Sequence, residues 1–189
     1  MSYYSEDELR EKNFEYLGNN VKISKNASIY NEELISIGDN SRIDDFCVLS
    51  GNISIGRNVH IAVFCNLVGG EKGIVMEDFS GLSFRVCLFA QSDDYTGSSM
   101  TNPTIPDIYK NITKKQIIIK KHAIIGANSL IFPGVTVAEG CAIGAMSMVI
   151  KDTESWKKYF GIPARVVGNR ENTLLELEAN YINDTRMNK

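Results

Sequence analysis

The chain has 189 residues, with 20 Lys and Arg against 23 Asp and Glu and a formal net charge of -3. This length suits one domain with short terminal pieces and is enough to bury a core. The charge excludes bulk attraction to nucleic acids or anionic membranes. No apolar run reaches the length of a membrane-spanning helix, and the N-terminus lacks the pattern of a signal peptide. We therefore expect a cytoplasmic protein.

Residues 1–20 are predicted to form an N-terminal helical segment. Residues 5–16 have an amphipathic pattern, and Ser5 and Glu8 have the spacing of a capping box. In a capping box each of the two side chains accepts a hydrogen bond from the other residue's backbone N–H. We therefore expect a helix over residues 5–16, followed by the main domain over residues 21–168.

An aliphatic residue recurs at every sixth position through most of the main domain, with one three-residue shift after Leu67. A repeat of this length is typical of a parallel β-helix, in which each hexad supplies one short strand and one corner. The aliphatic residue points inward, and a small residue four places later fits the interior beside it. The predicted inward aliphatic residues are Ile37, Ile43, Leu49, Ile55, Ile61, Leu67, Met76, Leu82, Leu88, Ile119, Ile125, Ile131, Val137, Ile143 and Val149.

The four cysteines fit this interior. Cys47, Cys65 and Cys141 occupy the small position, and Cys87 lies one place beyond it. Their spacing is that of neither a disulfide framework nor a zinc site. We therefore interpret them as small buried residues in a reducing compartment, and we expect no metal.

The repeat runs from about Val21 to Gln91, stops between about Asp93 and Lys115, and resumes at residues 117–150. The interruption is rich in Asp, Ser, Thr, Asn and Pro. A long loop within a compact repeat protein usually carries function. We therefore predict that loop 93–115 protrudes from the β-helix and contributes to a site.

Residues 169–189 are predicted to form a C-terminal helix and tail. Within them, residues 174–182 combine helix-forming residues with an apolar stripe. We expect this helix to pack on the base of the β-helix or on a neighbouring subunit.

Three hexads form one triangular coil, so residues six apart lie on neighbouring faces of a prism. His60 and Asn66 directly precede inward residues and should face outward near a corner. His122 follows two lysines and is expected to be exposed. The flat outer faces need covering, and parallel association of several copies would create clefts between subunits. We expect the functional site in such a cleft.

The hexads, the interrupting loop and a Gly-Ile-Pro-Ala-Arg segment together resemble the left-handed β-helix acyltransferases over about residues 37–170. The chain is most similar to the sugar O- and N-acetyltransferases, the group of maltose and galactoside acetyltransferases and lipopolysaccharide-modifying enzymes. This resemblance implies a left-handed coil, a homotrimer with active sites between subunits, and acetyl-CoA as co-substrate. The segments that carry it are residues 125–129, 132–136, 143–145, 151–152 and 161–165.

The resemblance also implies which residues bind CoA. Lys151 and Arg165 match positions that contact CoA in similar enzymes, where cations suit its phosphates. Ala127, Gly144 and Ala145 are small enough for an extended pantetheine arm to lie close to the backbone. The alternative is that the small residues merely suit β-helix corners and that the two cations are solvated.

The similar galactoside-type enzymes have a histidine at the mouth of the loop as general base, and the matching position here is Asp93. A carboxylate can replace it if burial or a neighbouring carboxylate raises its pKa. The alternative is that Asp93 and Asp94 initiate the loop, with Asp94 capping a turn. His60 is the competing candidate base, and a structural corner residue is its alternative.

Asn66 corresponds to an asparagine that orients the acceptor sugar in similar enzymes, and a polar corner residue is its alternative. Asp94 and Tyr95 complete the predicted substrate-binding set. A neutral amine attacks a thioester without a strong base, so the absence of the loop histidine favours an amino sugar. We predict acetyl transfer to a hydroxyl or amino group of a saccharide or nucleotide-linked sugar in surface-polysaccharide biosynthesis.

Two other classes of protein remain alternatives. A non-catalytic β-helix scaffold would have little reason to keep the long loop together with Lys151 and Arg165. A carbonic-anhydrase-like metalloenzyme needs three histidine ligands at each site. This chain has only His60 and His122, so a carboxylate would have to replace the third ligand.

Overall fold

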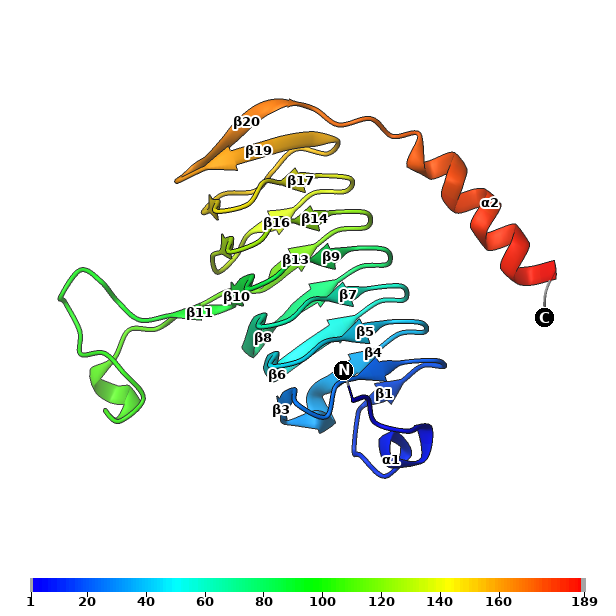
Figure 1. Ribbon diagram of the computed structural model, residues 1–189. Helices are drawn as coiled ribbons and strands as arrows, with labels where there is room; N and C mark the ends of the chain where they lie inside the picture. Colours follow the sequence, from blue (N-terminus) through cyan, green and yellow to red (C-terminus); the bar gives the residue numbers. More distant parts are fainter. Residues whose placement is uncertain (1, 188–189) are drawn as a thin grey trace.

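The six-residue repeat forms a parallel β-helix in the computed structural model, which describes residues 2–187 (Figure 1). Equivalent residues of successive coils lie opposite one another: Ile43 pairs with Ile61, and Ile61 with Leu82. The three-residue shift falls within one long strand, Asn66–Met76. Within the described residues, no helix has the length and apolar character needed to cross a membrane.

Two faces of the prism share a ten-stranded sheet in which β6 and β8 continue from one face to the next. All of its strand pairs are parallel. Its strands are β1 (Tyr16–Leu17), β3 (Ser28–Tyr30), β4 (Ile35–Ile37), β6 (Val48–Ile55), β8 (Asn66–Met76), β10 (Cys87–Phe89), β13 (Ile117–Ile119), β15 (Leu130–Ile131), β16 (Thr136–Val137) and β18 (Met148–Val149).

The third face is an eight-stranded sheet, which carries His60 on β7 and Arg165 on β20. Its last two strands form an antiparallel hairpin that closes the C-terminal end of the coil and that the repeat pattern does not predict. Its strands are β2 (Lys22–Ile23), β5 (Arg42–Ile43), β7 (His60–Ile61), β9 (Gly81–Leu82), β14 (Ile124–Ile125), β17 (Ala142–Ile143), β19 (Lys157–Gly161) and β20 (Ala164–Asn169).

The core of the prism is the column of inward residues that the sequence predicts. All fifteen predicted inward aliphatic residues are at most 3% exposed, and so are Cys47, Cys65 and Cys141. Cys87 is half-buried. Full burial of one such aliphatic side chain contributes about 1.5–3 kcal/mol, so the stacked column supplies much of the driving force for folding.

The N-terminal helix is shorter than predicted. Helix α1 spans only Glu6–Arg10, although the Ser5–Glu8 capping box is present as expected. The chain leaves the helix early because the first coil binds its backbone: the N–H of Glu15 donates to the carbonyls of Glu32 and Ile35. The segment after it packs Phe14 against the core. A short 3₁₀ helix, η1 (Glu32–Leu34), follows in the first coil.

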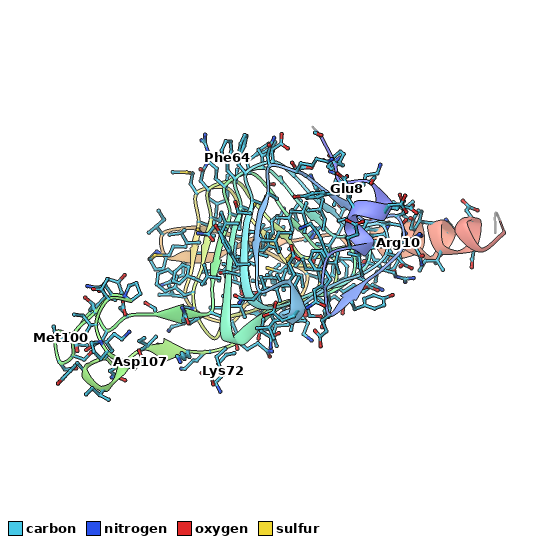
Figure 2. All side chains as sticks on the ribbon, turned by 90° about the horizontal axis from the view of Figure 1, so that it is seen from below. Glu8, Arg10, Phe64, Lys72, Met100 and Asp107 are labelled. Atoms are coloured by element: carbon cyan, nitrogen blue, oxygen red, sulfur yellow. The ribbon has the colours of Figure 1, made fainter. Side chains whose placement is uncertain are left out.

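The predicted loop leaves the prism as an arm between β10 and β13 (Figure 1). Its root is a two-stranded antiparallel pair, β11 (Gln91–Ser92) with β12 (Thr113–Lys114), and η2 (Asp107–Tyr109) lies near its tip. Figure 2 shows Met100 and Asp107 on the arm, well away from Phe64 on another edge of the prism. We call residues 93–112 the arm.

Helix α2 spans Leu174–Met187, longer than the predicted 174–182, and lies on the side of the prism opposite the arm (Figure 1). It does not pack on the base of the coil. Instead, Asn58 Nδ2 donates to the Tyr181 hydroxyl at 2.9 Å, and Lys121 Nζ lies 2.7 Å from Glu178 Oε1. Residues 1 and 188–189 of the predicted terminal segments lie outside the described residues.

Candidate active site

Asp93 stands at the root of the arm, directly after β11. Its side chain is half-buried, and its Oδ2 accepts a hydrogen bond from the backbone N–H of Asn102 at 3.2 Å. One carboxylate oxygen is therefore engaged in holding the arm, while the other has no hydrogen bond within the described residues. This position agrees with the predicted place at the mouth of the loop, and the role of Asp93 as a base stays a prediction.

Asp94 caps the turn that follows. Its carboxylate accepts hydrogen bonds from the backbone N–H and the hydroxyl of Thr96, at 2.8 and 2.7 Å, and from the hydroxyls of Ser98 and Ser99. These bonds, led by the one from the Thr96 backbone, lower the pKa of Asp94. The geometry favours the turn-capping alternative, because both carboxylate oxygens are occupied by donors from the arm itself.

Tyr95 projects from the arm into solvent with 93% of its surface exposed, and Ile108 near the arm tip is 84% exposed. The arm is nevertheless ordered by its own contacts. The backbone N–H of Met100 donates to the carbonyl of Tyr109 at 2.9 Å. The Lys110 ammonium lies 2.8 Å from Asp107 Oδ1. The arm therefore presents aromatic and aliphatic side chains that its own chain leaves exposed.

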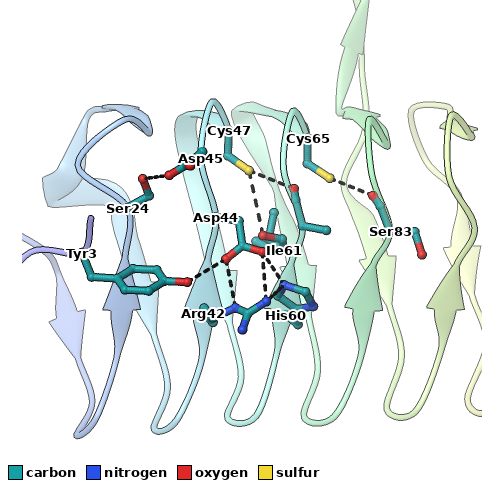
Figure 3. Close-up of polar contacts among 11 residues, drawn as sticks. Tyr3, Ser24, Arg42, Asp44, Asp45, Cys47, His60, Ile61, Cys65 and Ser83 are labelled. Atoms are coloured by element: carbon teal, nitrogen blue, oxygen red, sulfur yellow. Dashed lines mark hydrogen bonds and ion pairs between the residues drawn. The ribbon is translucent and has the colours of Figure 1, made fainter. Parts of the chain in front are cut away.

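His60 faces outward from β7, as predicted, within a charged cluster (Figure 3). Its Nε2 lies 2.8 Å from Oδ2 of Asp44 and 2.8 Å from Nη2 of Arg42. Arg42 occupies the equivalent position one coil earlier, where β5 pairs with β7. The Tyr3 hydroxyl donates to Oδ1 of Asp44 at 3.2 Å. These neighbours fix the orientation of the imidazole, whether its role is catalytic or structural.

Asp44 is the buried centre of this cluster, with 2% of its side chain exposed. Burial favours the neutral acid, but the hydrogen bonds from His60 and Arg42 outweigh it and lower the pKa of Asp44. Asp44 is therefore a carboxylate at neutral pH. The cluster of Arg42, Asp44 and His60 was not predicted from the sequence. The contact between Arg42 and His60 was predictable, because the two residues hold equivalent positions of the repeat.

Asn66 is the first residue of β8 and lies half-buried on the face next to that of His60. Its side-chain oxygen Oδ1 is buried and accepts no hydrogen bond within the described part of the chain. Buried acceptors of this kind are rare and call for a specific explanation. A bound hydroxyl or amide group would supply the missing donor, so this observation suits the predicted contact with an acceptor.

His122 is buried, contrary to the expected exposure. Its side chain is 8% exposed, its Nε2 lies 2.8 Å from Glu178 Oε2, and its ring stacks on Phe79 at 5.3 Å. Arg170 donates to the carbonyl of His122 at 2.8 Å. The neighbouring lysines indicated exposure, but α2 folds back over this corner and brings a carboxylate to the imidazole. Spacing along the repeat alone does not predict that contact.

The predicted CoA-binding residues lie on the last coils of the prism. Ala127 and Ala145 sit at successive corners next to Gly126 and Gly144, and a Cβ on Gly144 would lie 1.8 Å from the Phe160 ring. Gly144 therefore has a packing reason to be glycine. Arg165 lies exposed on β20, and Lys151 lies exposed two residues after the end of β18. The structure gathers this set at the C-terminal end of the coil, and its role stays a prediction.

Asp93 and His60 lie on opposite sides of one prism. The arm emerges between β10 and β13, which both belong to the ten-stranded sheet, so its root is the corner opposite the eight-stranded sheet that holds His60. Figure 1 shows the same separation between the arm and the side that α2 borders. The two candidate bases therefore do not share a site within one chain.

Comparison with known proteins supports an enzymatic role. The chain is 43% identical over 182 residues, 95% of its length, to a dTDP-4-amino-4,6-dideoxy-D-glucose acyltransferase from Escherichia coli, of which 94% is covered. It is 30% identical over 86% of its length to the galactoside O-acetyltransferase of Escherichia coli K12, of which 78% is covered. No family model matches the chain.

A solved structure gives the same result. AntD, an N-acyltransferase from Bacillus cereus crystallised with dTDP and 3-hydroxybutyryl-CoA, is 48% identical over 98% of both chains, with a TM-score of 0.96. This agreement confirms the predicted β-helix fold and the predicted acyltransferase function. The chain therefore belongs to the β-helix sugar acyltransferase family that includes the dTDP-4-amino-4,6-dideoxyglucose acyltransferases.

Proposed function

We propose that this protein transfers an acyl group from acyl-CoA to the amino group of a nucleotide-linked amino sugar in the cytoplasm. The single observation that carries the proposal is the 43% identity, along almost the whole chain, to an enzyme named for a dTDP-linked 4-amino sugar. AntD supports it, since one of its variants is bound to dTDP-4-amino-4,6-dideoxyglucose together with coenzyme A. Acetyl-CoA is the predicted donor.

The chemistry needs a positioned proton acceptor. The amine nitrogen attacks the thioester carbonyl carbon, the carbon–sulfur bond breaks, and the CoA thiolate leaves. The nitrogen must lose one proton, and the proposed acceptor is the carboxylate of Asp93, one of whose oxygens accepts no hydrogen bond from the described residues. Asp94 holds the turn beside it. This assignment suits an amine better than a hydroxyl, because a neutral amine needs no proton removed before it attacks.

We further propose that the active enzyme is a homotrimer, as the family resemblance implies. Support comes from Phe46 and Phe64, which stack with their ring centroids 5.0 Å apart and are 52% and 49% exposed on one corner. Both have a left-handed backbone, with φ of 60° and 63°, which is unfavourable for bulky residues. A neighbouring subunit that covers this corner would explain why aromatic residues stand there.

The proposed reaction is tested by measuring the release of the CoA thiol in the presence of each of three acceptors. The acceptors are dTDP-4-amino-4,6-dideoxyglucose, dTDP-glucose and galactose, each with acetyl-CoA or 3-hydroxybutyryl-CoA as donor. We expect turnover of the amino sugar with a mass increase equal to the acyl group, and no comparable turnover of the two hydroxyl acceptors. Preferential turnover of a hydroxyl acceptor would overturn the amine assignment while leaving the acyltransferase family intact.

A further inference from the structure

The carboxylate of Asp93 is held by one residue farther along the arm. The main chain of Asp93 is fixed at the arm root, where the Ser92 hydroxyl donates to the Asp93 carbonyl at 3.3 Å and β11 pairs with β12. The hydrogen bond from the Asn102 N–H to Oδ2, at 3.2 Å, is the only one that the carboxylate makes within residues 2–187. It restricts a terminal torsion that is otherwise broad. Asn102 therefore determines where Oδ1 of Asp93 points.

Asn102 presents this N–H from an uncommon backbone conformation. Its φ is 74°, and among the residues of the arm only Gly97 also has a positive φ. Asparagine adopts this region more readily than most L-residues, because its short polar side chain can form local hydrogen bonds. Here Oδ1 of Asn102 accepts from the backbone N–H and the hydroxyl of Thr104, at 2.9 and 2.6 Å. The side chain of Asn102 therefore stabilises the conformation that directs its N–H to Asp93.

Pro103 restricts the same turn further. A proline ring limits the backbone of the residue before it, and proline has no N–H that could compete for the Asp93 carboxylate. The N–H of Ile105 donates to the carbonyl of Asn102 at 3.4 Å and closes the turn. Sparsely populated backbone conformations persist only where the surrounding structure enforces them, and they cluster at functional sites. The turn at Asn102 is such a conformation, and it bears on the proposed base.

The turn is also fixed relative to the arm root. Ser99, three residues before Asn102, donates from its hydroxyl to Oδ2 of Asp94 at 3.0 Å. The same hydroxyl oxygen accepts from the backbone N–H of Asn111 at 3.2 Å, so it joins the outgoing and returning limbs of the arm. These cross-links hold the segment that carries Asn102 at a fixed place beside Asp93.

We propose that Asn102 is a positioning residue for acyl transfer and that it acts through Asp93. This inference rests on the proposed function. Asn102 binds Oδ2 of Asp93 and thereby turns Oδ1 toward the attacking amine. As the nitrogen–carbon bond forms and the carbon–sulfur bond of the thioester breaks, one proton passes from nitrogen to Oδ1, and sulfur leaves with the bonding electrons. A displacement of a reacting group by about 1 Å can reduce a rate about 10²-fold, so the orientation of the carboxylate matters.

Asn102→Val tests this role, with Asn102→Gly as the conservative variant and Asn31→Val as the matched control. All three keep the backbone N–H, but valine disfavours a positive φ, whereas glycine adopts it readily. Asn31 has the same kind of backbone, with a φ of 61°, on the first coil. We expect Asn102→Val to lower kcat about 10–100-fold, with KM for dTDP-4-amino-4,6-dideoxyglucose and for acetyl-CoA unchanged. Asn102→Gly should keep most of the wild-type kcat, and Asn31→Val all of it.

A double-mutant cycle with Asp93→Asn separates positioning from a general effect on the arm. In the Asp93→Asn background, Asn102→Val should lower the residual turnover less than about twofold, because no carboxylate remains to be oriented. Calorimetry with CoA and with dTDP completes the test, and Asn102→Val should bind both probes as the wild type does.

The outcomes separate the two proposals. A wild type that acylates no amino sugar overturns the proposed function and the inference with it. An active wild type whose two losses multiply in the double variant overturns the inference alone, because Asn102 then acts independently of Asp93. Equal losses in Asn102→Gly and Asn102→Val, or weaker binding of CoA or dTDP in Asn102→Val, overturn it as well. Full activity of Asp93→Asn would do the same, since Asn102 would have no base to position.

Discussion

Glu178 of α2 meets His122 of the β-helix in a contact that is shielded from solvent on both sides. Oε2 lies 2.8 Å from Nε2, and the two side chains are 9% and 8% exposed. Lys121 approaches the other carboxylate oxygen at 2.7 Å. Loss of one partner of such a contact leaves a buried polar group without compensation. The contact therefore contributes to holding α2 against the β-helix, together with the hydrogen bond from Asn58 to Tyr181.

Glu178→Gln should loosen α2 without unfolding the coil. We expect a local loss of about 1.5–3 kcal/mol, the usual contribution of a hydrogen bond to a charged group. Hydrogen exchange of the α2 amides measures it. Glu176→Gln, on an exposed position of the same helix, is the control and should leave exchange unchanged. Equal protection in both variants would show that the Glu178 contact does not hold the helix.

The docking of α2 should weaken in acid. Burial raises the pKa of Glu178, but its hydrogen bonds with Lys121 and His122 outweigh burial and lower that pKa below its ordinary value. A carboxyl with a lowered folded-state pKa stabilises fully above its unfolded pKa, and the stabilisation is lost as pH falls through the folded pKa. Exchange of α2 should therefore accelerate below about pH 4.5. Glu178→Gln should lack this change in the same pH range.

Asp93→Asn should lower kcat by about 10²–10⁴-fold, the usual contribution of a general base, with the melting temperature unchanged. The amide keeps the size of the side chain and its hydrogen bond to Asn102. Asp94→Asn should act differently, because it removes the charge that four hydrogen bonds of the arm surround. For this variant we expect faster proteolysis of the arm. His60→Gln completes the set, and a large loss of kcat there alone would make His60 the base.

Truncation of two adjacent residues on β15 should lower the free energy of unfolding by very different amounts. Ile131 is fully buried, whereas its neighbour Leu130 is 38% exposed. Ile131→Ala should cost about 2–5 kcal/mol because it leaves a cavity in the stacked column. Leu130→Ala should cost less than about 1 kcal/mol, as is usual for surface positions. Urea unfolding of the two variants measures the difference, and similar midpoints would contradict the assigned inward face.

Phe64→Asn should stabilise the single chain and weaken its assembly. Asparagine tolerates the left-handed backbone at this corner better than phenylalanine does. The change also removes the exposed ring on which Phe46 stacks and near which the Arg85 guanidinium lies, 5.5 Å from the centroid. Sedimentation over a range of concentrations should show a trimer that dissociates more readily than the wild type. An unchanged assembly would place the interface elsewhere.

The six-residue period predicted the coil because it depends on local alternation of inward and outward side chains. Ile61 and Cys65 are both fully buried, as the period requires. The same period also predicts that Arg42 and His60 are neighbours, because they hold equivalent positions on successive coils. The structure shows their side chains in contact. Registers within the repeat are therefore predictable from sequence, down to individual neighbours.

Contacts made by segments outside the repeat were not predictable in this way. His122 was expected to be exposed, because nothing in the spacing places Glu178 against it. The predicted helix over residues 5–16 ends at Arg10, since the first coil binds the following backbone. Each of these depends on the position of distant residues in three dimensions.

The arm and the eight-stranded sheet lie on opposite sides of the prism. If Asp93 acts together with residues on the eight-stranded sheet of a neighbouring chain, each reaction centre draws its parts from two chains, so the folded single chain is inert. Specific activity should then fall on dilution as the subunits separate.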